Sequence, residues 1–451
     1  MNILVINGSP KGKNSITLQT VLYLQKKNPG HTFEILHAGQ RIKALEKNFS
    51  TALEAISNAD VLLFSYPVYT FIAPCQLHRF IRLMKEHNAN VAGKIATQIS
   101  TSKHFYDTTA HRYIQDNVQE MGMYFIRGLS ADMEDLPTQK GRQEADSWFA
   151  HFVWCTENRY YEPYYPIPAP TKPVSVTVPE EALEGKPGDV VVIADLKPED
   201  TQLAGMIFRF RTKLPYATRV VNLQEYPFSG GCLGCFRCAA TGKCIHKDGF
   251  DEYLRTKIQT ADAMVFAFSI EDHSMGPLFK TYDDRQFCNG HRTVTIGMPV
   301  GYLISGNLSK EENLRTIIEG RAQVGSNILA GIATDETCTD AAIDSFAANL
   351  DYALKHRNTG PQNFYGVGGM KIFRDLIYQM RGFMRADHKF FKSHGQYDFP
   401  QKQWPKSLAM YLVGAMIANP KLHGKMDSKM TEGMLMPYVK VLKDLDKETS
   451  K

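Results

Sequence analysis

The sequence predicts two α/β domains in tandem, each a doubly wound parallel sheet, with a helical tail behind them. Buried strands alternate with helical segments twice along the 451 residues, and such alternation produces a parallel sheet covered on both faces. A stretch with seven prolines, at 160–187, is typical of a stiff connector and separates the two series. We therefore expect a first domain over 1–158, a linker over 159–187, a second domain over 188–358 and a C-terminal extension over 359–451.

The first series keeps to the strand–helix order, and its third strand is apolar enough to be covered on both faces. The expected strands of this half are 2–6, 32–36, 61–65, 95–100 and 124–126. The expected helices are 15–25, 47–58, 73–87 and 111–121.

The second series repeats this order after the linker. Its third strand follows a Thr-Ala-Asp step at 260–262, much as the first series has Asn-Ala-Asp at 58–60. We interpret the two halves as a duplication with divergence. The C-terminal tail does not repeat the pattern a third time. The expected strands are 189–194, 219–223, 263–269, 291–296 and 328–332, and the expected helices are 201–211 and 250–260.

Composition excludes several classes of protein. The net charge of +5 is a weak bias, and no run of lysine and arginine is dense enough to indicate a nucleic-acid partner. The first residues lack the pattern of a secretory signal. The longest late apolar run, 408–418, is shorter than the ~20 residues that span a bilayer. We expect a soluble, cytoplasmic protein without a transmembrane segment.

The loop after the first strand, Asn-Gly-Ser-Pro-Lys-Gly-Lys-Asn-Ser at 7–15, has the features of an anion cradle. Its glycines allow a tight turn, its hydroxyls can donate to phosphate oxygens, and the next helix aims free N–H groups at a ligand. It is no Walker A loop, because three residues separate Gly8 from Gly12 where that motif needs four, and GxGxxG is absent. The alternative is a plain turn with a helix cap.

A second loop, Ser-Tyr-Pro-Val-Tyr-Thr-Phe-Ile-Ala-Pro at 65–74, follows the third strand. It places aromatic and polar groups at the carboxyl edge of the sheet, where open α/β folds bind ligands. A proline turn with two core aromatics is the alternative interpretation.

Together these two loops make the first half, about 1–150, resemble the flavodoxin-like NAD(P)H-dependent FMN reductases. The resemblance implies FMN as cofactor and NAD(P)H as co-substrate. It assigns the FMN phosphate to the first loop, and the flavin ring to the second loop and the one after the fourth strand. The implied phosphate residues are Ser9, Lys11, Asn14, Ser15, Ile16 and Thr17. The implied ring residues are Pro67, Val68, Tyr69, Thr70, Ser100, Thr101 and Ser102.

Four cysteines crowd into one loop of the second half. Cys232, Cys235, Cys238 and Cys244 have the spacing C-x2-C-x2-C-x5-C, which favours one iron–sulfur cluster over zinc, whose structural sites usually bring two separated pairs. The loop resembles that of the iron–sulfur flavoproteins, which hold a [4Fe–4S] cluster next to FMN. Zinc, or a metal-free loop in a degenerate domain, remains an alternative.

Both flavin signatures are altered in the second half. Its first loop, 195–201, lacks glycine and carries three carboxylates that would repel a phosphate, and Ser-Ile-Glu-Asp-His-Ser at 269–274 replaces the ring loop. We expect no FMN there, although the segment 298–302 could still face a ligand. The halves look complementary, since one has flavin loops and the other the cysteines.

The resemblance implies a flavoprotein oxidoreductase that uses NAD(P)H to reduce a small electron-poor acceptor such as a quinone, nitro or azo compound, with the cluster as a relay. One alternative is an electron carrier fed by a ferredoxin-like protein without a nicotinamide site. Another is a second half that is a cofactor-free binding or assembly module. No catalytic acid or base is assigned, and a homo-oligomer is expected from the same resemblance. The tail is expected to dock on the second domain.

Overall fold

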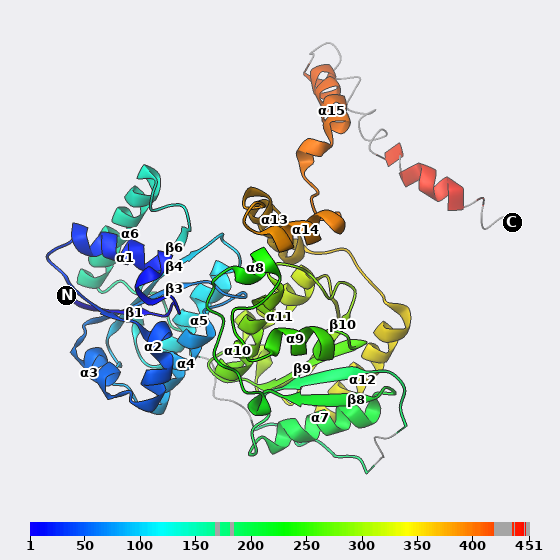
Figure 1. The fold of residues 1–451 in the computed structure, drawn as a ribbon, viewed down its shortest axis with the longest axis horizontal. Helices are drawn as coiled ribbons and strands as arrows, with labels where there is room; N and C mark the ends of the chain where they lie inside the picture. Colours follow the sequence, from blue (N-terminus) through cyan, green and yellow to red (C-terminus); the bar gives the residue numbers. More distant parts are fainter. Residues whose placement is uncertain (167–171, 181–184, 419–434, 437, 446, 448–451) are drawn as a thin grey trace. The chain divides into compact units, whose positions relative to one another are not determined.

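Two parallel sheets lie in residues 1–390, the first of the two units into which the chain divides; residues 391–451 form the second (Figure 1). The computed structural model describes residues 1–166, 172–180, 185–418, 435–436, 438–445 and 447. None of the helices described there combines the length and the apolar character needed to cross a membrane.

The first sheet has the strand order β2-β1-β3-β4-β5, and β6 also pairs with β4. Helices α1 and α6 share a core on one face, whereas α2 to α5 cover the other. The elements are β1 (Asn2–Asn7), α1 (Ile16–Lys27), β2 (Thr32–Leu36), α2 (Ala38–Lys47), α3 (Ser50–Asn58), β3 (Val61–Pro67), α4 (Cys75–Glu86), β4 (Ile95–Ser102), α5 (Asp107–Glu120), β5 (Tyr124–Phe125), β6 (Leu129–Asp132) and α6 (Gln139–Glu157).

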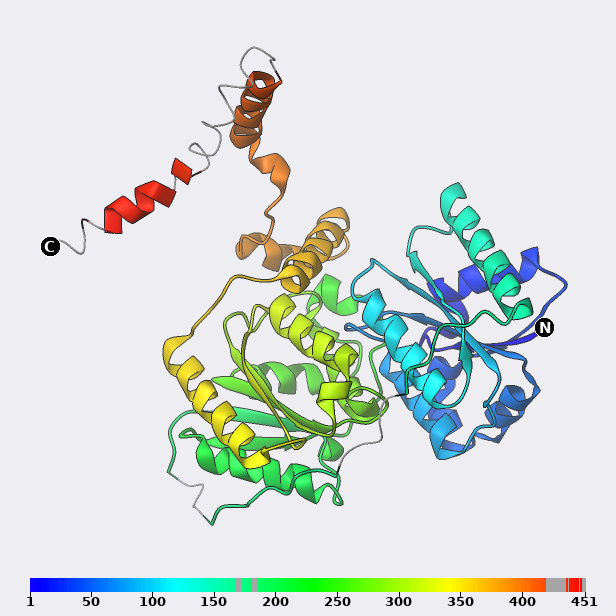
Figure 2. The same cartoon turned by 180° about the vertical axis from the view of Figure 1, so that it is seen from behind.

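The second sheet runs β8-β7-β9-β10-β11, which is the same order in its own numbering. Helices α7 and α12 pack on one face (Figure 2). The elements are β7 (Val190–Ala194), α7 (Thr201–Lys213), β8 (Thr218–Asn222), α8 (Arg237–Thr241), α9 (Phe250–Tyr253), β9 (Ala263–Ser269), α10 (Gly276–Arg285), β10 (Pro299–Ser305), α11 (Glu312–Gly325), β11 (Ile328–Thr334) and α12 (Thr339–His356), followed by α13 (Phe364–Gln379), α14 (Arg385–Ser393) and α15 (Trp404–Ile417).

The order 2-1-3-4-5, found twice, is that of flavodoxin-like sheets, so the predicted fold class is confirmed, with its helical C-terminal region. The duplication of one ancestral domain stays a prediction, because a shared topology does not establish common descent.

The expected strand at 291–296 is wrong, and β10 takes its place in the second sheet. Val294 and Ile296 are 44% and 50% exposed, whereas β10 is buried along almost its whole length. Proline is tolerated at the first residue of a strand, so Pro299 begins β10 although it suggested a loop. The segment 298–302 therefore forms no ligand-facing loop.

The expected helix at 47–58 corresponds to α3, which begins three residues later, and the separate helix α2 before it was not expected. Asn48 ends α2, and its side-chain oxygen accepts hydrogen bonds from the Ser50 N–H at 3.0 Å and the Ser50 hydroxyl at 2.6 Å. Asparagine favours such local bonds over a helix interior, which explains the break. The expected helix at 250–260 divides into α9 and a π-helical turn at Leu254–Ile258.

Part of the proline-rich linker is tied to the second domain. The Val174 N–H donates to the Asp335 carbonyl at 2.8 Å, and Arg209 donates to the Thr177 carbonyl at 2.9 Å. Residues 167–171 and 181–184 of the predicted linker lie outside the described part of the chain.

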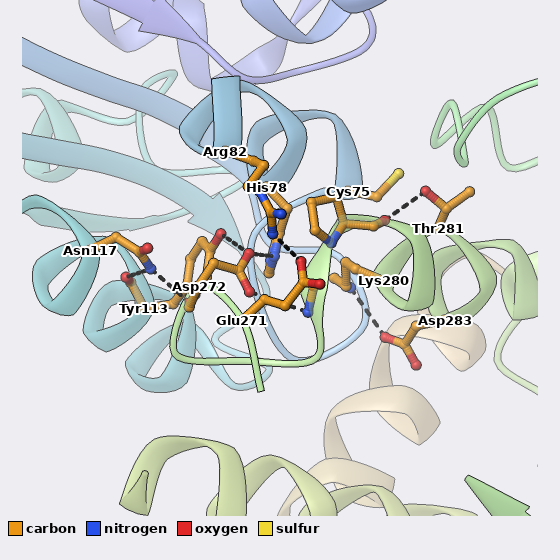
Figure 3. Close-up of polar contacts among 12 residues, drawn as sticks. Cys75, His78, Arg82, Tyr113, Asn117, Glu271, Asp272, Lys280, Thr281 and Asp283 are labelled. Atoms are coloured by element: carbon orange, nitrogen blue, oxygen red, sulfur yellow. Dashed lines mark hydrogen bonds and ion pairs between the residues drawn. The ribbon is translucent and has the colours of Figure 1, made fainter. Parts of the chain in front are cut away.

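The two domains share one core, in which α4 packs against α10 and α5 against α11. At its centre the buried carboxylate of Asp272 accepts hydrogen bonds from His78 Nδ1 and the Tyr113 hydroxyl, both at 2.7 Å (Figure 3). Burial alone would raise the pKa of Asp272, but the contacts with His78 and Tyr113 outweigh burial and lower it. Residues far apart in sequence thus lock the domains together.

His273 forms a second bridge between the domains and makes stability depend on pH. Its Nδ1 lies 3.0 Å from Glu311 Oε1, and its Nε2 lies 3.4 Å from Glu120 Oε2. Burial opposes the charge, but the bonds with Glu120 and Glu311 outweigh burial and raise the pKa of His273 from 6.5 to about 9. When the pKa of a histidine is higher in the folded state than in the unfolded state, its charge stabilises the fold. This stabilisation is complete at a pH below the pKa of the unfolded state and disappears as the pH rises through the pKa of the folded state.

We therefore expect His273 to contribute up to roughly 3 kcal/mol below about pH 6.5 and little above about pH 9. The measurement is urea unfolding of the wild type and the His273→Gln variant across this range. The two chains should differ most at the acidic end and converge as the pH rises; a difference independent of pH would contradict the assignment.

Candidate functional site

A cavity with an empty volume of about 1310 Å³, part of it open to solvent, is lined by both domains. The first domain contributes the ends of β1, β3 and β4. The in-register pairs Asn7–Ser65 and Pro67–Thr101 bring these strand ends to one edge of the sheet. The residues predicted for the cofactor that line the cavity are Ser9, Lys11, Ser15, Ile16, Thr17, Pro67, Val68, Tyr69, Thr70, Thr101 and Ser102.

Buried Asn7 shapes the first loop, which we call the phosphate loop (residues 7–18). Its amide donates to the Gly12 carbonyl at 2.9 Å and its oxygen accepts from the Ser9 N–H at 3.2 Å. The Ser9 hydroxyl accepts from the Lys11 N–H at 3.3 Å, and the Ser15 hydroxyl caps α1 by accepting from the Leu18 N–H at 3.4 Å. Both hydroxyls keep a proton to donate, and the first turn of α1 leaves backbone N–H groups without intrahelical partners. The loop therefore fits an anionic phosphate.

The third loop joins the first through paired threonines. The hydroxyls of Thr17, on α1, and Thr101, at the end of β4, lie 2.6 Å apart, and both side chains are buried. Two predicted residues are placed elsewhere. Asn14 is exposed and Ser100 bonds His111 at 2.8 Å beneath the sheet, so neither lines the cavity.

The second loop, which we call the ring loop (residues 67–74), contains a tight turn. Tyr69 and Ile72 exchange backbone hydrogen bonds of 2.8 and 3.1 Å, and the two residues between them, Thr70 and Phe71, have φ of 44° and 73°. Such conformations cost energy in residues other than glycine and tend to persist at binding sites. The Thr70 hydroxyl oxygen is buried at the cavity without a partner among the described residues. A polar ligand group at this wall would satisfy it, which fits the flavin ring.

The four cysteines of the second domain also line the cavity, in a segment that we call the cysteine loop (residues 229–249). Two glycines allow its close approach to the first domain. A Cβ on Gly231 would lie 2.1 Å from Cys75 Sγ, and one on Gly234, whose φ is +59°, would lie 1.8 Å from the Tyr69 hydroxyl. The cysteine loop therefore contacts the ring loop directly.

The cysteines fit an iron–sulfur cluster in donor type but are not gathered around one point. Burial raises the pKa of Cys238 to about 11 and raises the pKa of Cys232 as well. The Gly234 N–H donates to Cys232 Sγ at 3.4 Å, a contact of the kind that tunes cluster sulfurs. Within the described residues no three histidine, cysteine or acidic side chains could together hold a metal ion. The predicted ligand set stays a prediction.

Arg285 closes the cysteine loop at its base. It is 1% exposed, and its guanidinium donates to both carboxylate oxygens of Asp248, at 2.7 and 2.8 Å, and to the Gly230 carbonyl at 2.8 Å. Burial would raise the pKa of Asp248, but the bonds from Arg285 and Ser229 lower it well below its usual range. One ion pair thus joins the two ends of the loop.

Several cavity residues have no motif in the sequence. Cys288 is buried beside the cysteine loop, and burial raises its pKa to about 12. Helix α13, in the predicted tail, adds an apolar wall on which Phe373 stacks with Phe105 at 4.5 Å between ring centres. The aromatic content of the tail was a signal, but only the fold shows which rings reach the cavity. The further lining residues of this kind are Phe236, Phe287, His291, Ile372 and Leu376.

Comparison with known proteins agrees with this geometry. Residues 1–134 match the family model of the NADPH-dependent FMN reductases. An iron–sulfur flavoprotein of Archaeoglobus fulgidus is 23% identical over 175 residues, which are 36% of this chain and 78% of that protein. One of Clostridioides difficile is 35% identical over 54 residues, 12% of this chain and 24% of that protein.

Among solved structures, an NADH:FMN oxidoreductase is 20% identical with a TM-score of 0.30, and the match covers 34% of this chain and 88% of that one. Residues 1–134 are thus similar to the NADPH-dependent FMN reductases, and part of the chain is similar to iron–sulfur flavoproteins.

Proposed function

We propose that this chain, an oxidoreductase by its family, binds FMN in the first domain and uses NAD(P)H to reduce a small electron-poor acceptor in the adjoining cavity. The observation that carries the proposal is the meeting of the phosphate loop, the ring loop and Thr101–Ser102 on one cavity, with the Thr70 hydroxyl unpaired in its wall.

Different residues would bind the phosphate and the ring of FMN. Ser9, Ser15 and the N-terminus of α1 would donate to the phosphate, and the Lys11 ammonium would balance its charge. Thr70 and the backbone of the ring loop would hold the ring edge. FMN, when bound, supplies the transfer of electrons in pairs or singly, while the protein supplies orientation and exclusion of water.

The acceptor proposed is a planar conjugated compound, such as a quinone, a nitroarene or an azo dye. Phe105, Phe236, Phe287 and Phe373 line the cavity. Aromatic rings prefer offset stacking or edge contacts with other rings, which favours a flat, electron-poor partner. His291 also lines this wall.

The cysteine loop supports a further proposal, a [4Fe–4S] relay at the same cavity. In support, all four cysteines share the cavity with the ring loop, and Gly234 packs against Tyr69. Two alternatives remain as outcomes of the test: an electron carrier that a ferredoxin-like partner reduces, and a second domain that binds no cofactor.

The test is an anaerobic ultraviolet–visible spectrum with FMN, iron and sulfide counted per chain, followed by NADH and NADPH oxidation assays. We expect about one FMN, and about four irons if the relay exists. Nicotinamide oxidation that depends on an added quinone supports the reductase. Bound FMN without nicotinamide oxidation, but with reduction by ferredoxin, supports the carrier. Absence of FMN after reconstitution would contradict the whole proposal.

A further inference from the structure

The ring loop of the first domain is held by a side chain of the second. Lys280, on α10 (Figure 3), has no exposed surface. Its ammonium donates to the backbone carbonyls of Tyr69 at 2.9 Å and Thr70 at 3.3 Å. Both carbonyls belong to the turn of the ring loop in which Thr70 and Phe71 have positive φ. The contact joins positions more than 200 residues apart in the chain.

A carboxylate partner of Lys280 also binds the backbone just beyond the other end of the ring loop. Its ammonium also contacts Asp284 at 2.6 Å and Asp283 at 3.2 Å, and the second carboxylate oxygen of Asp284 accepts from the Cys75 N–H at 2.8 Å. Two carbonyls near the start of the ring loop and the amide of Cys75, the residue that follows the loop, therefore bind one buried ion pair on α10.

Two features indicate a role beyond packing. A buried ammonium is costly unless it is paired, and here it is matched by two carboxylates and two carbonyls. Thr70 and Phe71 have positive φ, which residues other than glycine rarely adopt, so contacts with the surrounding structure must stabilise this backbone conformation. Lys280 is the charged group that contacts the backbone at this turn.

A second turn provides a contrast. After β9, Glu271 and Ser274 pair as Tyr69 and Ile72 do after β3, and this turn enters the first domain. It carries its own carboxylate, Asp272, which binds His78 and Tyr113 as described above. The domains thus exchange equivalent turns, but only the turn of the first domain lines the cavity.

We infer that Lys280 is a positioning residue of the flavin site: the second domain sets the conformation of the ring loop, and the first domain alone does not complete the site. The inference rests on the proposed function, because it assumes that the cavity takes FMN.

The test compares full-length variants, each purified and stripped of FMN. In Lys280→Met/Asp284→Asn the ammonium and its closest carboxylate are removed together, so that less uncompensated charge remains in the core. We expect FMN to dissociate about tenfold more readily, and the visible circular dichroism of bound FMN to change, because the loop no longer presents one fixed wall. The single variant Lys280→Met should show the same changes if it folds.

Asp272→Asn is the matched control, because it weakens the reciprocal contact between the domains without touching the cavity. It should lower stability while leaving FMN affinity within about twofold of the wild type. Equal loss of FMN affinity in this control and the Lys280 variants would assign the effect to domain contact in general and overturn the inference.

Unchanged affinity and dichroism in folded Lys280 variants would also overturn it, and would leave the proposed function standing. Failure of the wild type to bind FMN would instead overturn the proposed function, and this inference with it.

Discussion

Replacing Arg285 with methionine is expected to lower the free energy of unfolding by about 3–5 kcal/mol. The guanidinium is 1% exposed and the side chain of its partner Asp248 is 6% exposed, so solvent screens the pair little. Without Arg285, the carboxylate stays buried at the base of the cysteine loop, where the remaining donors among the described residues are Ser229 and the Phe250 N–H. The measurement is urea unfolding followed by circular dichroism.

The same experiment includes two controls. Arg237→Met removes an exposed arginine of the same loop and should change stability by no more than about 0.5 kcal/mol. The double variant Arg285→Met/Asp248→Asn removes both charges and should recover part of the loss. A single variant as stable as the wild type would show that the ion pair does not close the loop.

The second large effect is expected from Gly234→Ala. The added Cβ would meet the Tyr69 hydroxyl at 1.8 Å and Tyr69 Cζ at 2.7 Å, so the tyrosine ring must move. Tyr69 lines the cavity, and its displacement would narrow the space proposed for FMN. We expect FMN affinity to fall at least about tenfold, measured by quenching of FMN fluorescence.

Gly249→Ala separates this clash from backbone strain. Gly249 has φ of +74°, comparable to the +59° of Gly234, but no atom lies within 4 Å of its added Cβ. The Gly249→Ala variant should have a free energy of unfolding about 1 kcal/mol lower than the wild type, because alanine is strained at positive φ, and it should keep its affinity for FMN. If both variants bind FMN equally, Gly234 serves only the turn, and the close contact with Tyr69 has no role in the cofactor site.

These contacts give the second half a structural role even if its cysteines bind no metal. Its own first loop is closed by its side chains: buried Asp195 accepts from Gln224 at 2.6 Å, and Lys197 pairs with Glu271. Burial raises the pKa of Asp195, which favours its neutral form. The second half contributes lining residues to the cavity and the lysine that binds the ring loop.

The local geometry of the phosphate loop could be predicted from the sequence, whereas its binding of FMN and a cluster at the four cysteines stay predictions. A glycine, a few hydroxyls and a helix start must lie together to hold a phosphate, and they do so within twelve residues. Ser100 was assigned to the site through its neighbours in the chain, but side chains alternate along a strand, and Ser100 faces His111 instead. The misplaced strand at 291–296 has the same origin, because short apolar runs do not reveal which segment will be buried.

By itself, the sequence determined that there are two parallel α/β units, where most of their strands lie and which loops carry polar groups, because periodicity and turn chemistry act over a few residues. Only the tertiary structure decided that the two units share one core, that Lys280 reaches the carbonyls of Tyr69 and Thr70, and that α13 covers the cavity. Such contacts join residues separated by some 200 positions or more. They follow from the packing of whole faces against each other, which no local pattern encodes.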